Sequence, residues 1–357
     1  MSHHHDPKAG PRPSDQLADG YSHNFRPLAP FDVTKAGTAS ALLEQYKHAS
    51  FGARDLGETA DVLFAMAQDN TCFKVGTFSG AMTIAKMGLL ITDMLDYGLI
   101  DAVVSTGALM CHGLVEQTGH THFKYDPSWS DEALYDAGYC RVYDTLELEA
   151  NLDAADEIIQ PVIGQFAGKD GFGSCDFNRA VGGYILEKYP GRGILQSAFK
   201  RGAPVYVPAF TDSELGLDVY TYNVNASLDG RPGVRYDGLR DIADYADRCA
   251  KAKSLGIFTI GGGVPRNWAQ QVGPLMELMG RRTKGRVTGS ARFKYAARIC
   301  PEPTHWGGLS GCTYSEGVSW GKFVPRDEGG LLAEAYVDAT VGWPLVVRAV
   351  LERMGRV

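Results

Sequence analysis

Short apolar runs that end in small or polar residues are the feature of this sequence that most restricts its fold. The runs cover residues 73–76, 102–105, 205–208, 257–260 and 335–338. Residues 39–68 and 81–97 carry apolar side chains at helical spacing and lie before and between the first two runs. This alternation of strand, tight turn and helix is typical of a parallel α/β sheet. We therefore predict a Rossmann-like parallel sheet flanked by helices.

The N-terminal thirty residues differ in character from the rest. They hold five prolines among polar residues, a composition that favours an extended arm: Pro7, Pro11, Pro13, Pro27 and Pro30. No convincing linker follows. We predict an arm over residues 1–30 and a single catalytic domain over residues 31–357.

Composition excludes several classes of protein. A net charge of -7 argues against nucleic-acid binding and is compatible with cationic substrates. No apolar run is long enough to span a bilayer, and the N-terminal residues show no charged start followed by an apolar signal core, so we expect a cytoplasmic protein. The seven cysteines form no Cys-x-x-Cys pair, which argues against a zinc ribbon or a disulfide framework. His120 and His122 have strand-like spacing but no clustered carboxylates, so no metal site is predicted.

Residues 316–322, with the sequence Glu-Gly-Val-Ser-Trp-Gly-Lys, place Lys322 beside Trp320 and six positions after Glu316. A lysine becomes a nucleophile when an apolar wall disfavours its charged form. Glu316 and Trp320 could hold the cationic end of an amine substrate. A surface lysine after a buried tryptophan is the alternative interpretation.

Several further segments occur in a fixed order with this one. They are residues 77–80 (Thr-Phe-Ser-Gly), 105–108 (Ser-Thr-Gly-Ala), 208–212 (Pro-Ala-Phe-Thr-Asp) with 215–216 (Leu-Gly), 261–264 (Gly-Gly-Gly-Val) and 337–339 (Val-Asp-Ala). Together with the lysine motif, the chain resembles deoxyhypusine synthases, and most of all their bacterial deoxyhypusine synthase-like relatives. The resemblance implies the NAD-binding fold of that family, with Lys322 as the covalent residue. It also implies a homotetramer with active sites at subunit interfaces.

No Gly-x-Gly-x-x-Gly fingerprint follows the first predicted strand, so the NAD contacts are taken from the resemblance. The implied cofactor residues are Ser79, Thr83, Thr106, Gly107, Ala108, Asp212, Gly262, Asp338 and Ala339.

The chain departs from the family pattern where the family carries acidic residues or a histidine. Residues 111–113 (Cys-His-Gly) replace a Glu-Glu-Asp run, and Leu217 replaces an aspartate that the adjacent Asp218 could substitute. Asn267 stands in place of an amine-contacting histidine, and Leu309 in place of a further aspartate. His112 is either an acid–base residue or a core histidine whose ring nitrogens are hydrogen-bonded. With fewer anions in the pocket, we expect an amine other than the family's protein acceptor.

The leading hypothesis is an NAD-dependent aminobutyl transferase that acts on a polyamine such as spermidine through an imine on Lys322, with homospermidine formation from putrescine as one outcome. A true deoxyhypusine synthase that modifies a lysine of a translation factor is the first alternative. The others are a sirtuin-like deacylase, which the lack of paired zinc cysteines disfavours, and a non-catalytic NAD- or polyamine-binding protein.

Overall fold

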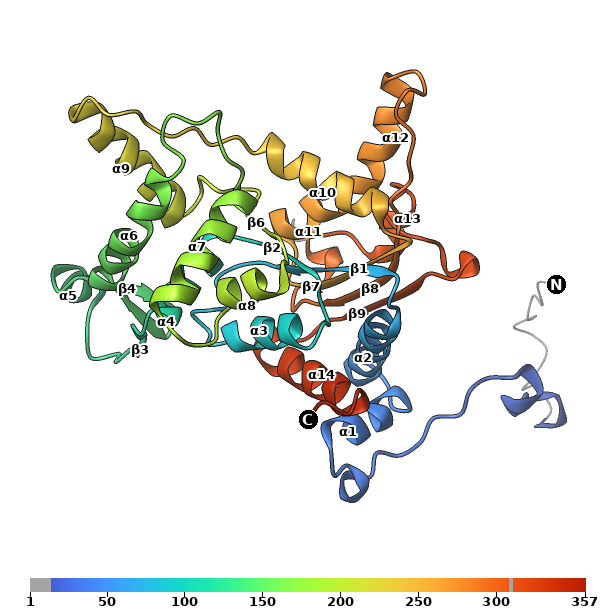
Figure 1. Ribbon diagram of the computed structural model, residues 1–357. Helices are drawn as coiled ribbons and strands as arrows, with labels where there is room; N and C mark the ends of the chain where they lie inside the picture. The colour runs from blue at the N-terminus through green and yellow to red at the C-terminus, as the bar shows by residue number, and fades with distance from the viewer. Residues whose placement is uncertain (1–13, 308–310) are drawn as a thin grey trace.

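The computed structural model describes residues 14–307 and 311–357, and a six-stranded sheet forms its centre (Figure 1). The strands run in the order β6-β2-β1-β7-β8-β9, and each pair of neighbours is parallel. Their bounds are β1 (Cys72–Phe78), β2 (Ala102–Ser105), β6 (Val205–Tyr206), β7 (Ser254–Ile260), β8 (Phe293–Ile299) and β9 (Leu331–Ala335). The predicted fold class, a Rossmann-like parallel sheet flanked by helices, is confirmed.

The central strands are buried on both faces because helices cover each side. Alternate residues of a strand point to opposite faces, so Val103 and Val104 pack in two different cores. The helices of the larger core are α1 (Ala39–Lys47), α2 (Gly52–Gln68), α3 (Gly88–Asp96), α4 (Gly107–Gln117), α6 (Glu149–Gly164), α7 (Ser174–Lys188), α8 (Ile194–Arg201), α9 (Glu214–Leu228) and α14 (Ala339–Arg353). The smaller core is covered by α10 (Leu239–Lys251), α11 (Gly263–Gln270), α12 (Val272–Arg282) and α13 (Tyr314–Val318).

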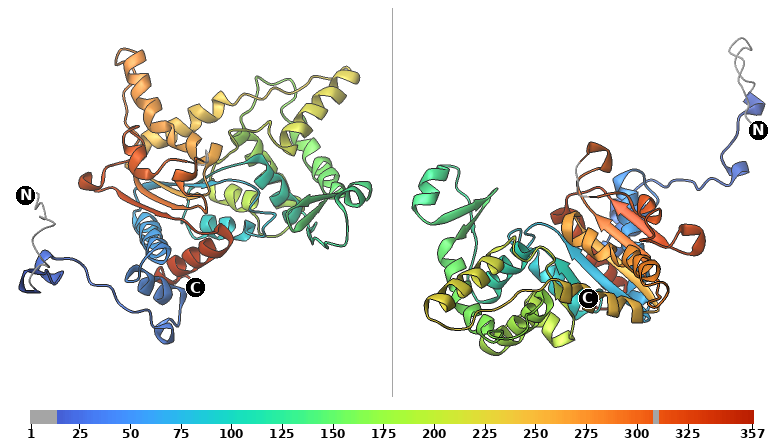
Figure 2. Two further views of the ribbon diagram at one scale, coloured as in Figure 1. Left: turned by 180° about the vertical axis from the view of Figure 1, so that it is seen from behind. Right: turned by 90° about the horizontal axis from the view of Figure 1, so that it is seen from above.

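A second, antiparallel sheet stands apart from the central one (Figure 2). Its three strands, in the order β3-β5-β4, are β3 (Phe123–Lys124), β4 (Tyr139–Val142) and β5 (Thr145–Leu148), and α5 (Asp131–Asp136) lies between β3 and β4. The sequence analysis did not predict this sheet. Its strands have two to four residues each, too few for an apolar period to stand out.

Three predicted elements differ from the structure. The helix expected over 81–97 begins at Gly88, because residues 81–87 form turns and Lys86 adopts a left-handed backbone with φ of 63°. The helical region 39–68 is split at Phe51, whose φ is 59°. The strand expected at 335–338 lies earlier, at Leu331–Ala335, and β8 was not predicted.

Residues 14–37 contain only short 3-10 helices and lead away from the body of the molecule (Figure 1). These helices span Ser14–Gln16, Tyr21–His23 and Val33–Lys35, and two more span Thr304–Trp306 and Arg326–Glu328. Among the described helices, none combines the length and hydropathy that a transmembrane span requires.

Candidate active site

The carboxyl ends of the three central strands bring small and hydroxyl-bearing residues together. Ser79, which follows β1, donates through Oγ to the carbonyl of Gly262 after β7, and accepts from the Gly262 N–H at 3.1 Å. Thr106, which follows β2, donates to the carbonyl of Gly80 at 2.6 Å and caps α4 by accepting from the N–H of Leu109 at 3.2 Å. The side chains therefore link three neighbouring loops into one edge.

Close backbone packing explains the small residues at the start of α4. A Cβ on Gly107 would lie 2.1 Å from Oγ of Ser213, so no larger residue fits without a shift. Ala108 follows in the first turn of the helix. Thr83 is fully buried, and its hydroxyl donates to the carbonyl of Leu109 at 2.9 Å. Thr83 was predicted to contact NAD, but its hydroxyl is used to bond the backbone of α4.

Two carboxylates lie at opposite ends of this row of loops. Asp212 is exposed in the segment after β6, and Asp338 is exposed at the start of α14, after β9. With six strands spaced about 4.8 Å apart, the row is roughly 24 Å wide. Oδ1 of Asp338 accepts from the N–H and hydroxyl of Thr340, at 2.7 and 2.5 Å, and these bonds lower the Asp338 pKa. Ala339 is the buried first residue of α14.

This edge fits a dinucleotide. Hydroxyl groups and glycine backbone at strand ends suit a pyrophosphate, and exposed carboxylates suit ribose hydroxyls. The residues that would hold NAD are Ser79, Thr106, Gly107, Asp212, Gly262 and Asp338.

Lys322 is 7% exposed and lies on the side of the sheet covered by α10–α13. Its Nζ donates to Oδ1 of Asn267 at 3.2 Å and stands 5.9 Å from the centre of the Trp320 ring. Burial lowers the pKa of Lys322, and the nearby Arg266 guanidinium lowers it further, against the opposing effects of Cys312 and Glu316. The amine is therefore biased toward its neutral, nucleophilic form.

The position of Asn267 relates Lys322 to the strand ends. Asn267 lies four residues after Gly263, where α11 begins at the carboxyl end of β7. Four residues of α-helix rise about 6 Å. The amine of Lys322 therefore ends about one helical turn from the Gly262 loop, on the side of α11.

Two buried arginines connect this lysine segment to the strand ends. Arg298 donates through Nε to the carbonyl of Gly261 at 2.8 Å and pairs with Glu334 at 3.4 Å. Arg266 donates through Nη2 to the carbonyl of Cys312 at 2.8 Å. A Cβ on Gly311 would lie 1.9 Å from Nη1 of Arg266, so a larger residue there would displace the guanidinium. Neither arginine was predicted from the sequence. Arg266 could have been found, because it lies three residues after the glycine run.

Glu316 and Trp320 form the open side of the lysine site. Both are exposed, and the Trp320 side chain is 63% exposed even though it lies beside a buried amine. An indole in that position offers a face to a cationic ligand.

The structure does not bring Asp218 and His112 to Lys322 within one chain. Asp218 lies on α9, where burial, together with the charges of Asp156 and Glu214, raises its pKa to about 7. His112 lies on α4, which packs in the larger core, and its Nδ1 bonds Glu147 at 2.8 Å. Leu217 is 59% exposed. Leu309 lies outside the described residues.

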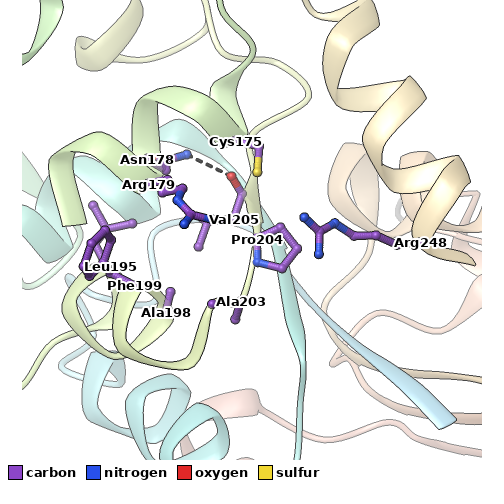
Figure 3. Close-up of a pocket in the computed structure, with 11 residues that line it drawn as sticks. Cys175, Asn178, Arg179, Leu195, Ala198, Phe199, Ala203, Pro204, Val205 and Arg248 are labelled. Atoms are coloured by element: carbon purple, nitrogen blue, oxygen red, sulfur yellow. Dashed lines mark hydrogen bonds between the residues drawn. The ribbon is translucent and has the colours of Figure 1, made fainter. Parts of the chain in front are cut away.

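One cavity is too small to be the substrate site. It lies between α7, α8 and β6, where Asn178 donates to the carbonyl of Val205 at 3.2 Å (Figure 3). Its volume of about 20 Å³ is room for a single water molecule, so it cannot hold a polyamine.

Fold and site together define a Rossmann-like protein with a buried lysine of lowered pKa near the carboxyl ends of its strands. The family model "Deoxyhypusine synthase" matches residues 41–350, and the chain belongs to the deoxyhypusine synthase family. This family consists of NAD-dependent enzymes that transfer an aminobutyl group from spermidine.

Similar proteins agree with this assignment. The chain is 32% identical to "Probable deoxyhypusine synthase 2" of Methanosarcina acetivorans over 92% of its own length and 90% of that protein. It is 28% identical to "Deoxyhypusine synthase-like protein" of Elusimicrobium minutum, over 88% and 81%. Its fold is similar to "Crystal Structure of a putative deoxyhypusine synthase from Entamoeba histolytica", with a TM-score of 0.57, 11% identity and coverage of 90% and 96%.

Proposed function

We propose that this chain catalyses NAD-dependent transfer of an aminobutyl group from a polyamine such as spermidine to an acceptor amine, through an imine on Lys322. The observation that carries the proposal is the buried Lys322 amine, with its lowered pKa, one helical turn from the strand-end loops. NAD held at those loops would supply the reversible hydride acceptor that this transfer requires.

The reaction balances without any other oxidant. The donor carbon beside the secondary amine loses a hydride and its nitrogen loses a proton, which leaves a C=N bond. Neutral Nζ of Lys322 adds to that carbon. The bond between this carbon and the original nitrogen then breaks, and 1,3-diaminopropane leaves with that nitrogen. The aminobutyl group is then held as an imine on Lys322. The acceptor amine adds to the same carbon, Lys322 leaves, and the returned hydride with one proton gives the product amine.

The neighbouring side chains divide the remaining tasks. Oδ1 of Asn267 accepts an N–H of the Lys322 amine and so aims its lone pair. Trp320 and Glu316 hold the cationic end of the donor, the first by a cation–π contact and the second by charge.

We propose a small amine as the acceptor, with homospermidine formed from putrescine. Residues 111–113 (Cys-His-Gly) and the exposed Leu217 stand where the family pattern has carboxylates, so the pocket offers fewer anions than the family's pocket does. A lysine of a translation factor is the second candidate acceptor, because relatives 30–32% identical are named deoxyhypusine synthases.

Product analysis separates the two acceptors. The purified chain would be incubated with NAD and labelled spermidine, and with either putrescine or the translation factor from the same source. Our proposal predicts labelled homospermidine together with 1,3-diaminopropane. Label on the factor and none on putrescine would support the second candidate, and no label on either would contradict aminobutyl transfer.

We also propose a cytoplasmic homotetramer whose active sites lie at subunit interfaces, with one domain over residues 31–357. Exposed apolar side chains on α9 and beside the lysine site support an interface there: Leu217, Tyr220, Leu228, Val264 and Trp320. A second subunit would supply the half-buried carboxyl of Asp218, which one chain holds away from Lys322.

A further inference from the structure

Three side chains that are distant in sequence converge in a buried cluster beside α4. His112 comes from α4, His122 from the segment just before β3, and Glu147 from β5. Oε2 of Glu147 lies 2.8 Å from Nδ1 of His112 and 2.6 Å from Nε2 of His122. The His122 and Glu147 side chains are 0% and 1% exposed. The three atoms lie within 4.8 Å of one another.

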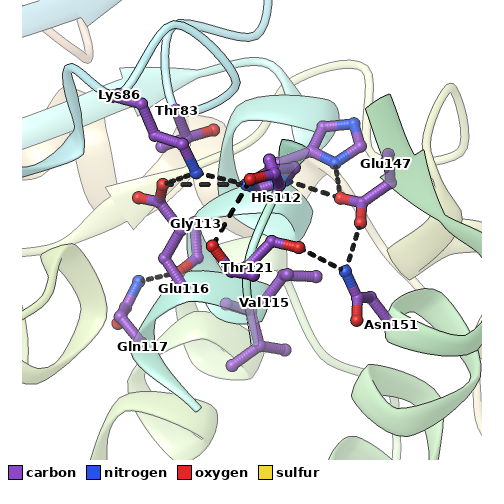
Figure 4. Close-up of polar contacts among 12 residues, drawn as sticks. Thr83, Lys86, His112, Gly113, Val115, Glu116, Gln117, Thr121, Glu147 and Asn151 are labelled. Carbon is purple, nitrogen blue, oxygen red and sulfur yellow. Dashed lines mark hydrogen bonds and ion pairs between the residues drawn. The ribbon is translucent and has the colours of Figure 1, made fainter. Parts of the chain in front are cut away.

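The carboxylate is oriented by bonds to its other oxygen (Figure 4). Oε1 of Glu147 accepts from Nδ2 of Asn151 at 2.8 Å and from the N–H of Leu148 at 2.9 Å. Asn151 also donates to the carbonyl of Thr121, beside His122, at 3.0 Å. These bonds leave Oε2 facing the two imidazole nitrogens. Carboxylates that bind metals directly are typically held by hydrogen bonds of this kind.

We propose that His112, His122 and Glu147 bind a divalent cation of the zinc class. Two imidazole nitrogens and one carboxylate oxygen form a donor set that suits zinc and leaves a fourth position open. Bonds of about 2.1 Å in tetrahedral geometry place ligand atoms about 3.4 Å apart. The present contacts would therefore open by roughly 0.7 Å as the ion replaces the N–H protons between the ligands.

The surroundings of His122 can accommodate that exchange. Its Nδ1 lies 3.7 Å from Oε1 of Glu116 and 2.7 Å from Nζ of Lys86, which itself pairs with Glu116 at 2.6 Å. With the ion on Nε2, the proton would move to Nδ1, so the Lys86 ammonium would have to withdraw from Nδ1 and let Glu116 close in from 3.7 Å to accept that N–H. Two carboxylates against one ammonium leave negative charge for the cation. Lys86 and Glu116 also line an open cavity of about 380 Å³, which gives the ion a route from solvent.

The ion would fasten α4 to the three-stranded sheet, since its ligands come from both. It gives His112 the role of a ligand in place of the acid–base role predicted from the sequence. The inference is independent of aminobutyl transfer, because it concerns binding of a metal by the full chain.

The test is metal binding by the full-length protein after removal of metals with a chelator. Zn²⁺ would be titrated into wild-type protein and into His122→Gln and Glu147→Gln, and Co²⁺ would report the coordination by its visible spectrum. His120→Ala is the matched control, because His120 lies two residues away and bonds the hydroxyl of Thr118 at 3.2 Å instead. A variant with alanine at the three N-terminal histidines excludes binding there: His3, His4 and His5.

We expect one equivalent of Zn²⁺ in wild-type protein, in His120→Ala and in the N-terminal variant, with a rise in melting temperature. His122→Gln and Glu147→Gln should bind at least ten-fold more weakly, and Glu116→Gln about 10- to 100-fold more weakly. Wild-type protein that takes up no zinc overturns the proposal whether or not the variants fold. Equal affinity in Glu147→Gln would overturn it as well.

Discussion

Substitution of Asn267 should change the reactivity of Lys322 in opposite directions, depending on the residue introduced. Oδ1 of Asn267 accepts from Nζ at 3.2 Å, a bond that favours the charged amine. Asn267→Ala removes about 1 kcal/mol of that preference, which raises the fraction of neutral amine near pH 7 about five-fold. Asn267→Asp places a full charge at the same distance. Its attraction is roughly 1.3 kcal/mol at the dielectric constant of water and about 5 kcal/mol at an effective dielectric constant of 20, so the neutral fraction of the Lys322 amine falls by about nine-fold or more.

The assay follows the rate at which a short aliphatic aldehyde forms a reducible imine on Lys322, trapped with cyanoborohydride and quantified by peptide mass spectrometry. The exposed Lys200 on α8 serves as an internal reference in each variant. The rate at Lys322 should rise in Asn267→Ala and fall in Asn267→Asp, while Lys200 is unchanged. Shifts in the same direction, or none, would refute the idea that this hydrogen bond sets the protonation of Lys322.

Two further predictions concern stability. Gly107→Ala should lower the free energy of unfolding by about 1–3 kcal/mol and weaken NAD binding, because the new Cβ would lie 2.1 Å from Oγ of Ser213. Gly191→Ala is the control, because nothing lies within 4 Å of its Cβ. In the same denaturant titration its free energy of unfolding should change by no more than about 0.5 kcal/mol. Burial and two neighbouring carboxylates raise the pKa of Asp218 to about 7, so the folded state holds its proton more tightly than the unfolded state. Stability at this group is therefore lost as pH rises from about 4 to 7, and Asp218→Asn should stabilise the protein by up to about 4 kcal/mol at pH 8 and by little at pH 4. An equal effect at both pH values in thermal melts would contradict that assignment.

Much of the central sheet could be predicted from the sequence because its strands are buried on both faces. Residues 102–105 coincide with β2, and the runs at 73–76 and 257–260 lie within β1 and β7. β8 was not predicted because its buried arginine and a lysine interrupt the apolar run. Its Arg298 is stabilised there by bonds that include those to Gly261 and Glu334. The start of α3 was predicted too early because Lys86 adopts a left-handed backbone conformation, which is unusual for a lysine and cannot be predicted from its residue type.

The site divides in the same way. The strand-end residues came from the family resemblance, whereas the contact of Lys322 with Trp320 could be predicted because the two residues are close in sequence. The resemblance placed Asn267 among the amine-contacting residues, but its bond to Lys322 was not predicted, since 55 positions separate the two residues. The cluster around Glu147 could not be predicted, because its carboxylate lies 25 residues after His122 and 35 after His112. His122 was paired with His120 on spacing alone, and the tertiary structure separates them.

Aminobutyl transfer through Lys322 can be tested by borohydride trapping of the purified protein with NAD and spermidine, read by intact-mass and peptide mass spectrometry. We expect one aminobutyl adduct per chain, confined to Lys322 and absent in Lys322→Ala. NAD binding shown separately, with no adduct from spermidine, putrescine or other polyamines, would contradict the lysine-imine mechanism.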